Sequence, residues 1–123
     1  RAIPLPVSAP FHCRLLKPAA DAMAEALAKI EIKAPVVPVV ANVLAAPISD
    51  PAEIRTRLVE QVTGTVRWRE CVLAMVAAGV TDLYEIGTGK VLSGLAGRID
   101  KSLKATPVGT PADIDAVAAQ LLT

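Results

Sequence analysis

The sequence is poor in cysteine, histidine and aromatic residues, and its charges nearly cancel. Two cysteines are too few for a disulfide framework, so we expect a reducing, cytoplasmic compartment. Thirteen basic and twelve acidic residues give a net charge of +1, without the basic footprint of a protein that binds nucleic acid or anionic membranes. We find no run of 18 apolar residues and no secretory signal, so we expect neither a membrane span nor export.

What the sequence does have is aliphatic bulk. Hydrophobic residues make up 53% of the 123 residues and charged residues 20%, which is typical of a globular domain with an aliphatic core. The chain opens on Arg1 in what looks like the middle of a fold, without a methionine. We therefore expect one domain, or part of one within a longer protein.

Short apolar runs alternate with segments of helical periodicity. The expected strands cover residues 3–7, 36–40, 81–86 and 106–108, with a loop at 44–49. The expected helices cover residues 15–30, 51–61, 66–78, a stretch from 91, and 111–122. This alternation predicts an α/β fold in which a parallel sheet is flanked by helices on both faces.

The helix boundaries have local signals. Asp50, Pro51 and Glu53 suit an N-cap, a first helical position and the partner of a capping box. The run from Thr110 to Asp113 predicts a second capped start, and Gly79 predicts a helix end.

The run from Gly87 to Lys90 does not meet the requirements of a nucleotide-binding loop. A P-loop needs glycine where Tyr84 stands and serine or threonine where Val91 stands, and a dinucleotide fingerprint needs glycine where Leu92 stands. The run predicts a glycine turn between a strand and a helix. No serine lies in a Gly-x-Ser-x-Gly turn and no metal-ligand spacing is present, so the residues predict neither a cofactor nor a metal.

His12 is the only histidine, and it follows a proline-rich apolar run where a helical pattern begins. A neutral imidazole is well suited to proton transfer near pH 7. The neighbouring Cys13 does not suggest a dyad, because adjacent side chains diverge. The chain offers His12 no nucleophile, so the residues alone leave open a structural histidine and a general base.

Four ordered blocks cover almost the whole chain and resemble malonyl-CoA:acyl carrier protein transacylases, over roughly the C-terminal two fifths of that family. They run from Pro4 to Ala20, Val37 to Val43, Gln61 to Trp68 and Leu83 to Leu95. The resemblance implies a serine acyltransferase that moves malonyl from malonyl-CoA to acyl carrier protein through a malonyl-serine ester.

The resemblance also implies two subdomains and a missing part. Residues 1–8 would end a small ferredoxin-like subdomain, and residues 9–123 would be the C-terminal part of a large subdomain similar to α/β hydrolases. The nucleophilic serine, a malonate-binding arginine and the oxyanion-hole donors would lie in a missing N-terminal portion. The chain alone is therefore expected to be inactive and to leave apolar sheet edges uncovered.

Within the resemblance, His12 matches the general base, and Gln61 matches a residue whose main-chain carbonyl holds the imidazole. Phe11, Asn42 and Val91 fall at positions expected to contact substrate. Phe11 stands where free-standing bacterial members often have serine. Phenylalanine at this position resembles the malonyl-selective acyltransferase domains of polyketide synthases. A ring there predicts selection of malonyl over methylmalonyl by about 1–3 kcal/mol; alternatively, Phe11 only packs at the subdomain junction.

Two other functions remain open. The chain could be an acyltransferase domain of a polyketide or fatty-acid megasynthase, or a non-catalytic α/β interaction module. A Gly-His-Ser-x-Gly turn upstream of Arg1 would indicate catalysis. A capped last helix that ends near the final residue favours a stand-alone enzyme over a megasynthase domain.

Overall fold

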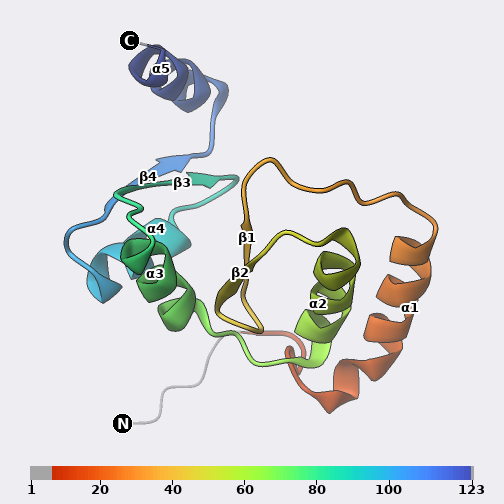
Figure 1. Ribbon diagram of the computed structural model, residues 1–123. Coiled ribbons are helices and arrows are strands. Elements are labelled where there is room, and N and C mark those ends of the chain that lie inside the picture. The colour runs from red at the N-terminus through yellow and green to blue at the C-terminus, as the bar shows by residue number, and fades with distance from the viewer. Residues whose placement is uncertain (1–6, 123) are drawn as a thin grey trace, which may run out of the picture. The chain divides into compact units, whose positions relative to one another are not determined.

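The computed structural model describes residues 7–122, so the expected strand at residues 3–7 lies outside the described residues except for Val7. Five α-helices, one 3-10 helix and four short strands alternate along this range (Figure 1). The chain divides into two compact units, residues 1–71 and 72–123. The predicted α/β class is confirmed, and each unit is best understood by itself.

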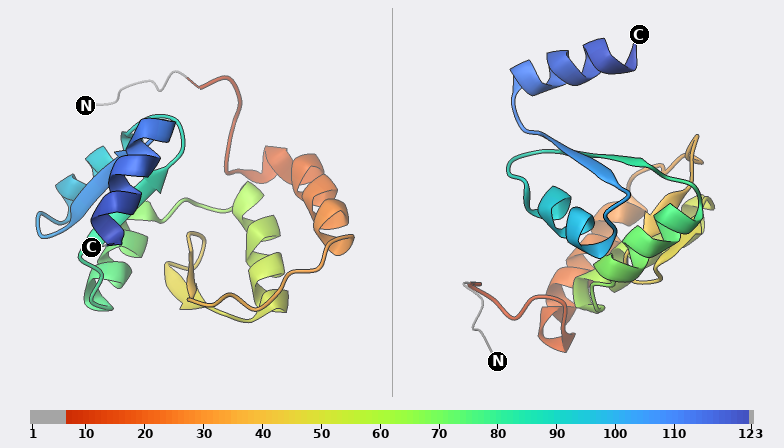
Figure 2. Two further views of the ribbon diagram at one scale, coloured as in Figure 1. Left: turned by 90° about the horizontal axis from the view of Figure 1, so that it is seen from above. Right: turned by 90° about the vertical axis from the view of Figure 1, so that its left-hand side faces the viewer.

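In the first unit, two helices lie side by side and a strand pair packs against the second of them (Figures 1 and 2). A 3-10 turn, η1 (Arg14–Leu16), leads into α1 (Lys17–Ala28), which ends two residues before the predicted end at residue 30. Pro18 lies in the first turn of α1, where its missing N–H costs nothing. The second helix, α2 (Pro51–Thr63), starts where the sequence predicted.

The strand pair corrects two predictions. β1 (Val39–Ala41) is shorter than expected, and β2 (Ala46–Ile48) occupies the segment predicted to be a loop. The two strands are antiparallel, with Val39 opposite Ile48, so no parallel sheet forms here. Pro47 lacks an N–H donor, but in a two-stranded sheet it lies on an edge, where a missing donor is tolerated.

A tight turn makes this reversal possible. The main-chain N–H groups of Leu44 and Ala45 both donate to the carbonyl of Ala41, at 3.0 and 2.7 Å. Ala45 has a φ of 55°, a left-handed conformation that nothing in its side chain predicts. Beneath the turn, Ala41, Ile48 and Ile54 form the buried core that joins the strands to α2.

The start of α2 confirms one predicted capping contact and corrects the other. The Asp50 carboxylate accepts a hydrogen bond from the Glu53 N–H at 2.8 Å, as an N-cap should. The predicted reciprocal bond of a capping box is absent from the contacts of Glu53. Its carboxylate instead pairs with Arg57, one helical turn later, at 3.2 Å.

The second unit contains the predicted parallel pair. β3 (Asp82–Ile86) and β4 (Lys104–Val108) are parallel and in register over five residues, with α4 (Val91–Ile99) as their crossover (Figure 2). α3 (Trp68–Ala77) precedes them and includes the division between the units, and α5 (Pro111–Leu121) follows. Buried Ala96, Leu103 and Val108 form part of the core of this unit.

The local signals of this unit are confirmed. Gly79, with φ of 90°, lies at the turn that follows α3. Gly87 and Gly89 also have positive φ values, of 142° and 100°, as a glycine turn between a strand and a helix requires. Thr110 and Asp113 form a complete capping box at the start of α5.

Glu85 caps α4 from the neighbouring strand. Its carboxylate accepts from the Leu92 N–H at 3.0 Å, the Ser93 N–H at 2.8 Å and the Ser93 hydroxyl at 2.7 Å. The Ser93 side chain and main chain, followed by other main-chain donors of the helix start, lower the pKa of Glu85. Because Lys90 provides no side-chain cap, Glu85 takes the place of the usual N-cap.

Replacing Glu85 with glutamine should therefore lower stability at neutral pH but not in acid. A carboxyl group whose pKa is lowered by folding stabilises the folded state fully above its unfolded pKa of about 4.3. That contribution is lost as the pH falls through the lower pKa of the folded state. Urea unfolding at several pH values should show the Glu85→Gln deficit at pH 7 and its disappearance at the acid end. Asp115→Asn, at an exposed carboxylate, should show no such deficit, and equal deficits would contradict this account.

Apolar side chains stand exposed near both small sheets. Val36 and Val37, just before β1, are 102% and 70% exposed, and Ile86 at the end of β3 is 80% exposed. Incomplete cover of the strands was expected for part of a larger fold. Within residues 7–122, none of the helices is long and apolar enough to span a membrane.

Candidate active site

The imidazole of His12 contacts the C-terminal turn of α2. Its Nδ1 lies 2.9 Å from the main-chain oxygen of Gln61, across 49 positions of sequence. A carbonyl oxygen only accepts hydrogen bonds, so this contact requires the proton on Nδ1. In the neutral imidazole Nε2 then keeps its lone pair and is able to accept a proton, and the His12 side chain is exposed.

The end of α2 explains why a main-chain oxygen is available there. The last four carbonyls of a helix have no partner within it. Here Glu60 accepts from the Gly64 N–H at 2.8 Å, and Gln61 accepts from His12 instead of from a further helical residue.

The backbone at His12 is in an unusual conformation. Its φ of 57° lies in the left-handed region, which few residues other than glycine adopt. The Phe11 N–H donates to the Ala9 carbonyl at 2.9 Å, and the Cys13 thiol donates to the Pro10 carbonyl at 3.0 Å. Strained backbone of this kind costs about 1–3 kcal/mol and is concentrated at functional sites.

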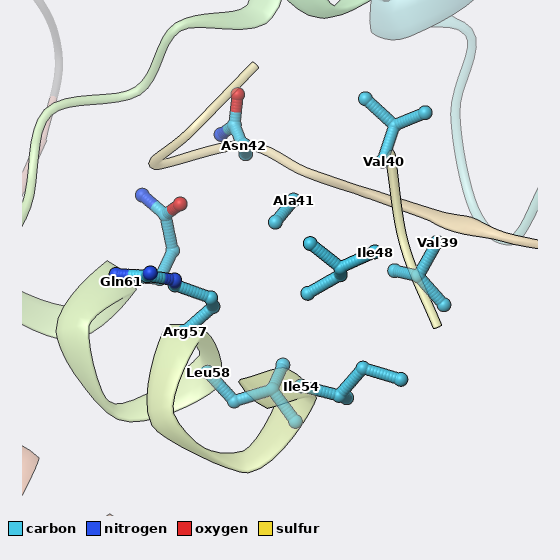
Figure 3. Close-up of a pocket in the computed structure, with 9 residues that line it drawn as sticks. All are labelled: Val39, Val40, Ala41, Asn42, Ile48, Ile54, Arg57, Leu58 and Gln61. Atoms are coloured by element: carbon cyan, nitrogen blue, oxygen red, sulfur yellow. The ribbon is translucent and has the colours of Figure 1, made fainter. Parts of the chain in front are cut away.

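The other side of Gln61 faces a pocket of about 240 Å³ between α2 and the strand pair (Figure 3). Its walls are mostly aliphatic, with three polar side chains, and the lining residues are Val39, Val40, Ala41, Asn42, Ile48, Ile54, Arg57, Leu58 and Gln61. Among the described residues, the buried Oε1 of Gln61 and Nε of Arg57 have no hydrogen-bond partner. Gln61 thus joins the imidazole contact to the pocket.

Arg57 is held at the pocket by two carboxylates of its own helix. Its guanidinium donates to Glu60 at 2.7 Å and to Glu53 at 3.2 Å, and these bonds raise its pKa further above the usual value, that to Glu60 most. The cation is therefore already paired. Arg57 was not among the predicted site residues, although Glu53, Arg57 and Glu60 stand at i, i+4 and i+7, a spacing that indicates ion pairs along a helix.

Asn42 lines the same pocket and is fixed by two contacts. Its main-chain oxygen accepts from the Arg67 N–H at 3.3 Å, and its side-chain oxygen accepts from the Cys71 thiol at 3.4 Å. Cys71 is 2% exposed, and burial is the main cause of its raised pKa. Its thiol therefore acts as a neutral donor to Asn42, in line with the prediction of a small buried residue.

The structure brings together some of the predicted site residues. His12 and Gln61 are in contact, and Gln61 and Asn42 line one pocket. Phe11 precedes His12 and is 55% exposed, while Val91 begins α4 in the second unit and is 69% exposed. The substrate contacts of Phe11, Asn42 and Val91 stay predictions. Among residues 7–122, no group of three His, Cys, Asp or Glu side chains is placed to hold a metal ion.

Curated proteins that are similar to this chain carry the same name. The chain is 50% identical over 120 residues to the malonyl CoA-acyl carrier protein transacylase of Salmonella typhimurium, covering 98% of this chain and 39% of that protein. It is 45% identical over 115 residues to the protein of the same name from Bacillus subtilis, covering 94% of this chain and 36% of that protein. No protein-family model matches the chain.

Solved structures that resemble this chain carry names of the same kind. The acyl-carrier-protein-S-malonyltransferase of Bartonella henselae has a TM-score of 0.89 at 54% identity, over 100% of this chain and 39% of that one. A malonyl-transacylase solved in complex with its type II PKS acyl-carrier protein has a TM-score of 0.85 at 43% identity, over 98% of this chain and 39% of that one. The chain spans less than two fifths of the length of these relatives. It is therefore a homologue of part of the malonyl-CoA:acyl carrier protein transacylases, which confirms the resemblance that its motifs predicted.

Proposed function

We propose that this chain supplies the general-base half of a malonyl transfer site, in which malonyl passes from malonyl-CoA to acyl carrier protein through a malonyl-serine ester. The observation that supports this most is the bond from His12 Nδ1 to the Gln61 carbonyl, which leaves Nε2 free. It occurs in a chain that is 50% identical to a named transacylase. The setting would be fatty acid biosynthesis in the cytoplasm.

The proposed chemistry uses His12 twice in each half-reaction. Nε2 takes the proton of a serine hydroxyl as its oxygen attacks the malonyl thioester, and the C–S bond then breaks. The imidazolium returns that proton to the departing thiolate, which needs little help because a thiol has a pKa near 8.5. In the second half, Nε2 takes the proton of the acyl carrier protein thiol, which attacks the ester. The serine oxygen leaves and recovers a proton from the imidazolium.

The serine and the groups that hold malonate and the oxyanion belong, in this proposal, to an N-terminal portion that supplies the remaining length of the relatives. Residues 9–123 then complete a large subdomain similar to α/β hydrolases, and residues 1–8 end a small ferredoxin-like subdomain. Phe11, Asn42 and Val91 contact the substrate, and the Phe11 ring disfavours an α-methyl group. The chain alone is inactive.

A polyketide setting is the second candidate. The relative solved with a type II PKS acyl-carrier protein is 43% identical to this chain, against 50% for the Salmonella typhimurium transacylase. The chemistry at His12 is the same in both settings. They differ in the carrier protein that receives malonyl, so a comparison of carriers from the two pathways distinguishes them.

The proposed function is tested with a chimera in which this chain replaces the matching part of the Salmonella typhimurium transacylase. The chimera should transfer malonyl from malonyl-CoA to acyl carrier protein, and the chain alone should not. A folded chimera without transfer would contradict the proposal, because the identity of 50% predicts compatible halves.

Replacing Gln61 with alanine should cost little activity. The contact with His12 uses the main-chain oxygen, which alanine retains, and the side chain makes only a long bond from Nε2 to the Gly64 carbonyl, at 3.4 Å. Losing one such bond should lower kcat of the chimera by less than about tenfold. A loss as large as that caused by replacing His12 would show that the side chain has a role beyond this contact.

A further inference from the structure

We infer that Arg67 is a positioning residue for His12, acting through the turn that follows β1 and the last turn of α2. This inference rests on the proposed function, because it concerns how the general base is held. Arg67 contacts neither His12 nor Gln61 in the structure. The route between them consists of hydrogen bonds and close packing within the first unit.

The first step is the bond from Arg67 to the turn. Its guanidinium Nη1 donates to the Leu44 carbonyl at 2.9 Å, and its main-chain N–H donates to the Asn42 carbonyl at 3.3 Å. Two carbonyls, two residues apart, are therefore held by one residue. A third contact, from Nε to Glu70 at 3.5 Å, is longer and steadies the guanidinium from α3.

The second step is the packing of that turn against the end of α2. A Cβ added to Gly64 would lie 2.9 Å from Cγ2 of Val43 and 2.8 Å from the carbonyl oxygen of Glu60. Real Cβ atoms essentially never come that close to other heavy atoms. The turn and the helix end are thus in direct contact at Gly64, and a shift of the turn changes the space available to the helix end.

The third step connects Gly64 with the imidazole. The Gly64 N–H donates to Glu60, and the Gly64 carbonyl accepts from the Gln61 side chain. The Gln61 side chain therefore bonds to Gly64, in the segment between α2 and α3, while its main-chain oxygen bonds to His12. If the Arg67 side chain no longer holds Leu44, the turn and the helix end gain freedom, and the Gln61 oxygen is held less firmly against Nδ1.

The sole histidine makes this inference measurable in the 123-residue chain without any activity assay. With 15N-labelled histidine, the two ring nitrogens of His12 give signals that no other residue contributes. At a pH where the imidazole is neutral, these signals report the ratio of the Nδ1–H to the Nε2–H tautomer. Arg67→Ala should lower that ratio about 2- to 10-fold, the factor associated with one net hydrogen bond.

Arg69→Ala is the matched control. Arg69 is exposed at the start of α3, two positions from Arg67, and its side chain makes no hydrogen bond or ion pair among the described residues. Arg69→Ala removes the same charge from nearly the same place but breaks no bond to the turn. It should therefore leave the tautomer ratio unchanged. An equal change in both variants would overturn the inference, because it would point to net charge rather than to the bonds of Arg67.

Far-UV circular dichroism and the urea midpoint show whether each variant folds. An unchanged tautomer ratio in folded Arg67→Ala would overturn the inference. Should Arg67→Ala unfold, Arg67→Met decides, since it keeps an aliphatic side-chain stem and the main-chain N–H but has no donor for the Leu44 carbonyl. A lower ratio supports the inference and an unchanged ratio overturns it. Neither result depends on malonyl transfer, so failure here is distinct from failure of the proposed function.

Discussion

Replacing His12 with asparagine is expected to slow malonyl transfer by the chimera about 10²–10⁴-fold, the usual contribution of a general base. Asparagine removes the proton acceptor at Nε2 but tolerates the left-handed backbone found at this position. Alanine is a poorer choice, because φ of 57° would strain it and confuse lost chemistry with lost structure. The measurement is steady-state transfer from malonyl-CoA to acyl carrier protein.

The control for this prediction is stability. The His12→Asn chimera should unfold at nearly the urea concentration of the unsubstituted chimera, which separates a chemical defect from a folding defect. Transfer within threefold or so of the original rate by a folded variant would show that His12 is not the general base, given the magnitude expected for that role.

Replacing Gly64 with alanine is expected to lower the free energy of unfolding by about 1–3 kcal/mol, as overpacking of a tight contact does. The added methyl group would meet the Glu60 carbonyl oxygen at 2.8 Å and the Val43 side chain at 2.9 Å. The first of these is main chain of α2, which cannot swing aside. Urea unfolding can be followed by the fluorescence of Trp68, the only tryptophan, which begins α3.

Gly97→Ala provides the matched comparison. Gly97 lies within α4, and an added Cβ would meet nothing within 4 Å. The same substitution there should leave the stability unchanged or raise it by about 0.5–1 kcal/mol, because alanine favours the helix over glycine. Equal effects at both positions would show that the close approach at Gly64 does not govern the packing of α2 against the turn.

The elements that were predicted correctly are those whose sequence signals, such as N-caps and glycine stops, lie close to the structure that they specify. Asp50 and Thr110 accept hydrogen bonds as N-caps, and Gly79 ends a helix as expected. The parallel pair of β3 and β4 also followed from the pattern, because a crossover helix between two apolar runs favours parallel pairing. In each case the structure-forming contact lies within one turn or one crossover.

The predictions that failed concern contacts for which several partners compete. The segment of β2 was predicted to be a loop, and only its pairing with β1 makes it a strand. Glu53 was expected to complete a capping box, but its carboxylate forms an ion pair with Arg57 instead. The hydrogen bond from the Arg67 guanidinium to the Leu44 carbonyl joins residues 23 positions apart, and no signal in the sequence predicted it.

The candidate site also depends on a contact between distant residues that the sequence pattern did not predict. The residues alone identified His12 as unusual but left its role open, and the family resemblance was needed to pair it with Gln61, 49 positions away. The structure contains that contact. Periodicity cannot predict it, because both partners lie at ends of elements where the pattern stops, and the accepting atom belongs to the main chain, which every residue has.

The central claim is that Nε2 of His12 takes a proton from a serine hydroxyl, and the most direct test is the rate at which malonyl becomes attached to the protein. Intact-mass spectrometry of the chimera, sampled after mixing with malonyl-CoA, follows the malonyl adduct without acyl carrier protein. The account predicts one rapidly formed adduct that appears about 10²–10⁴-fold more slowly in His12→Asn. Equal rates of adduct formation in the two proteins would contradict it.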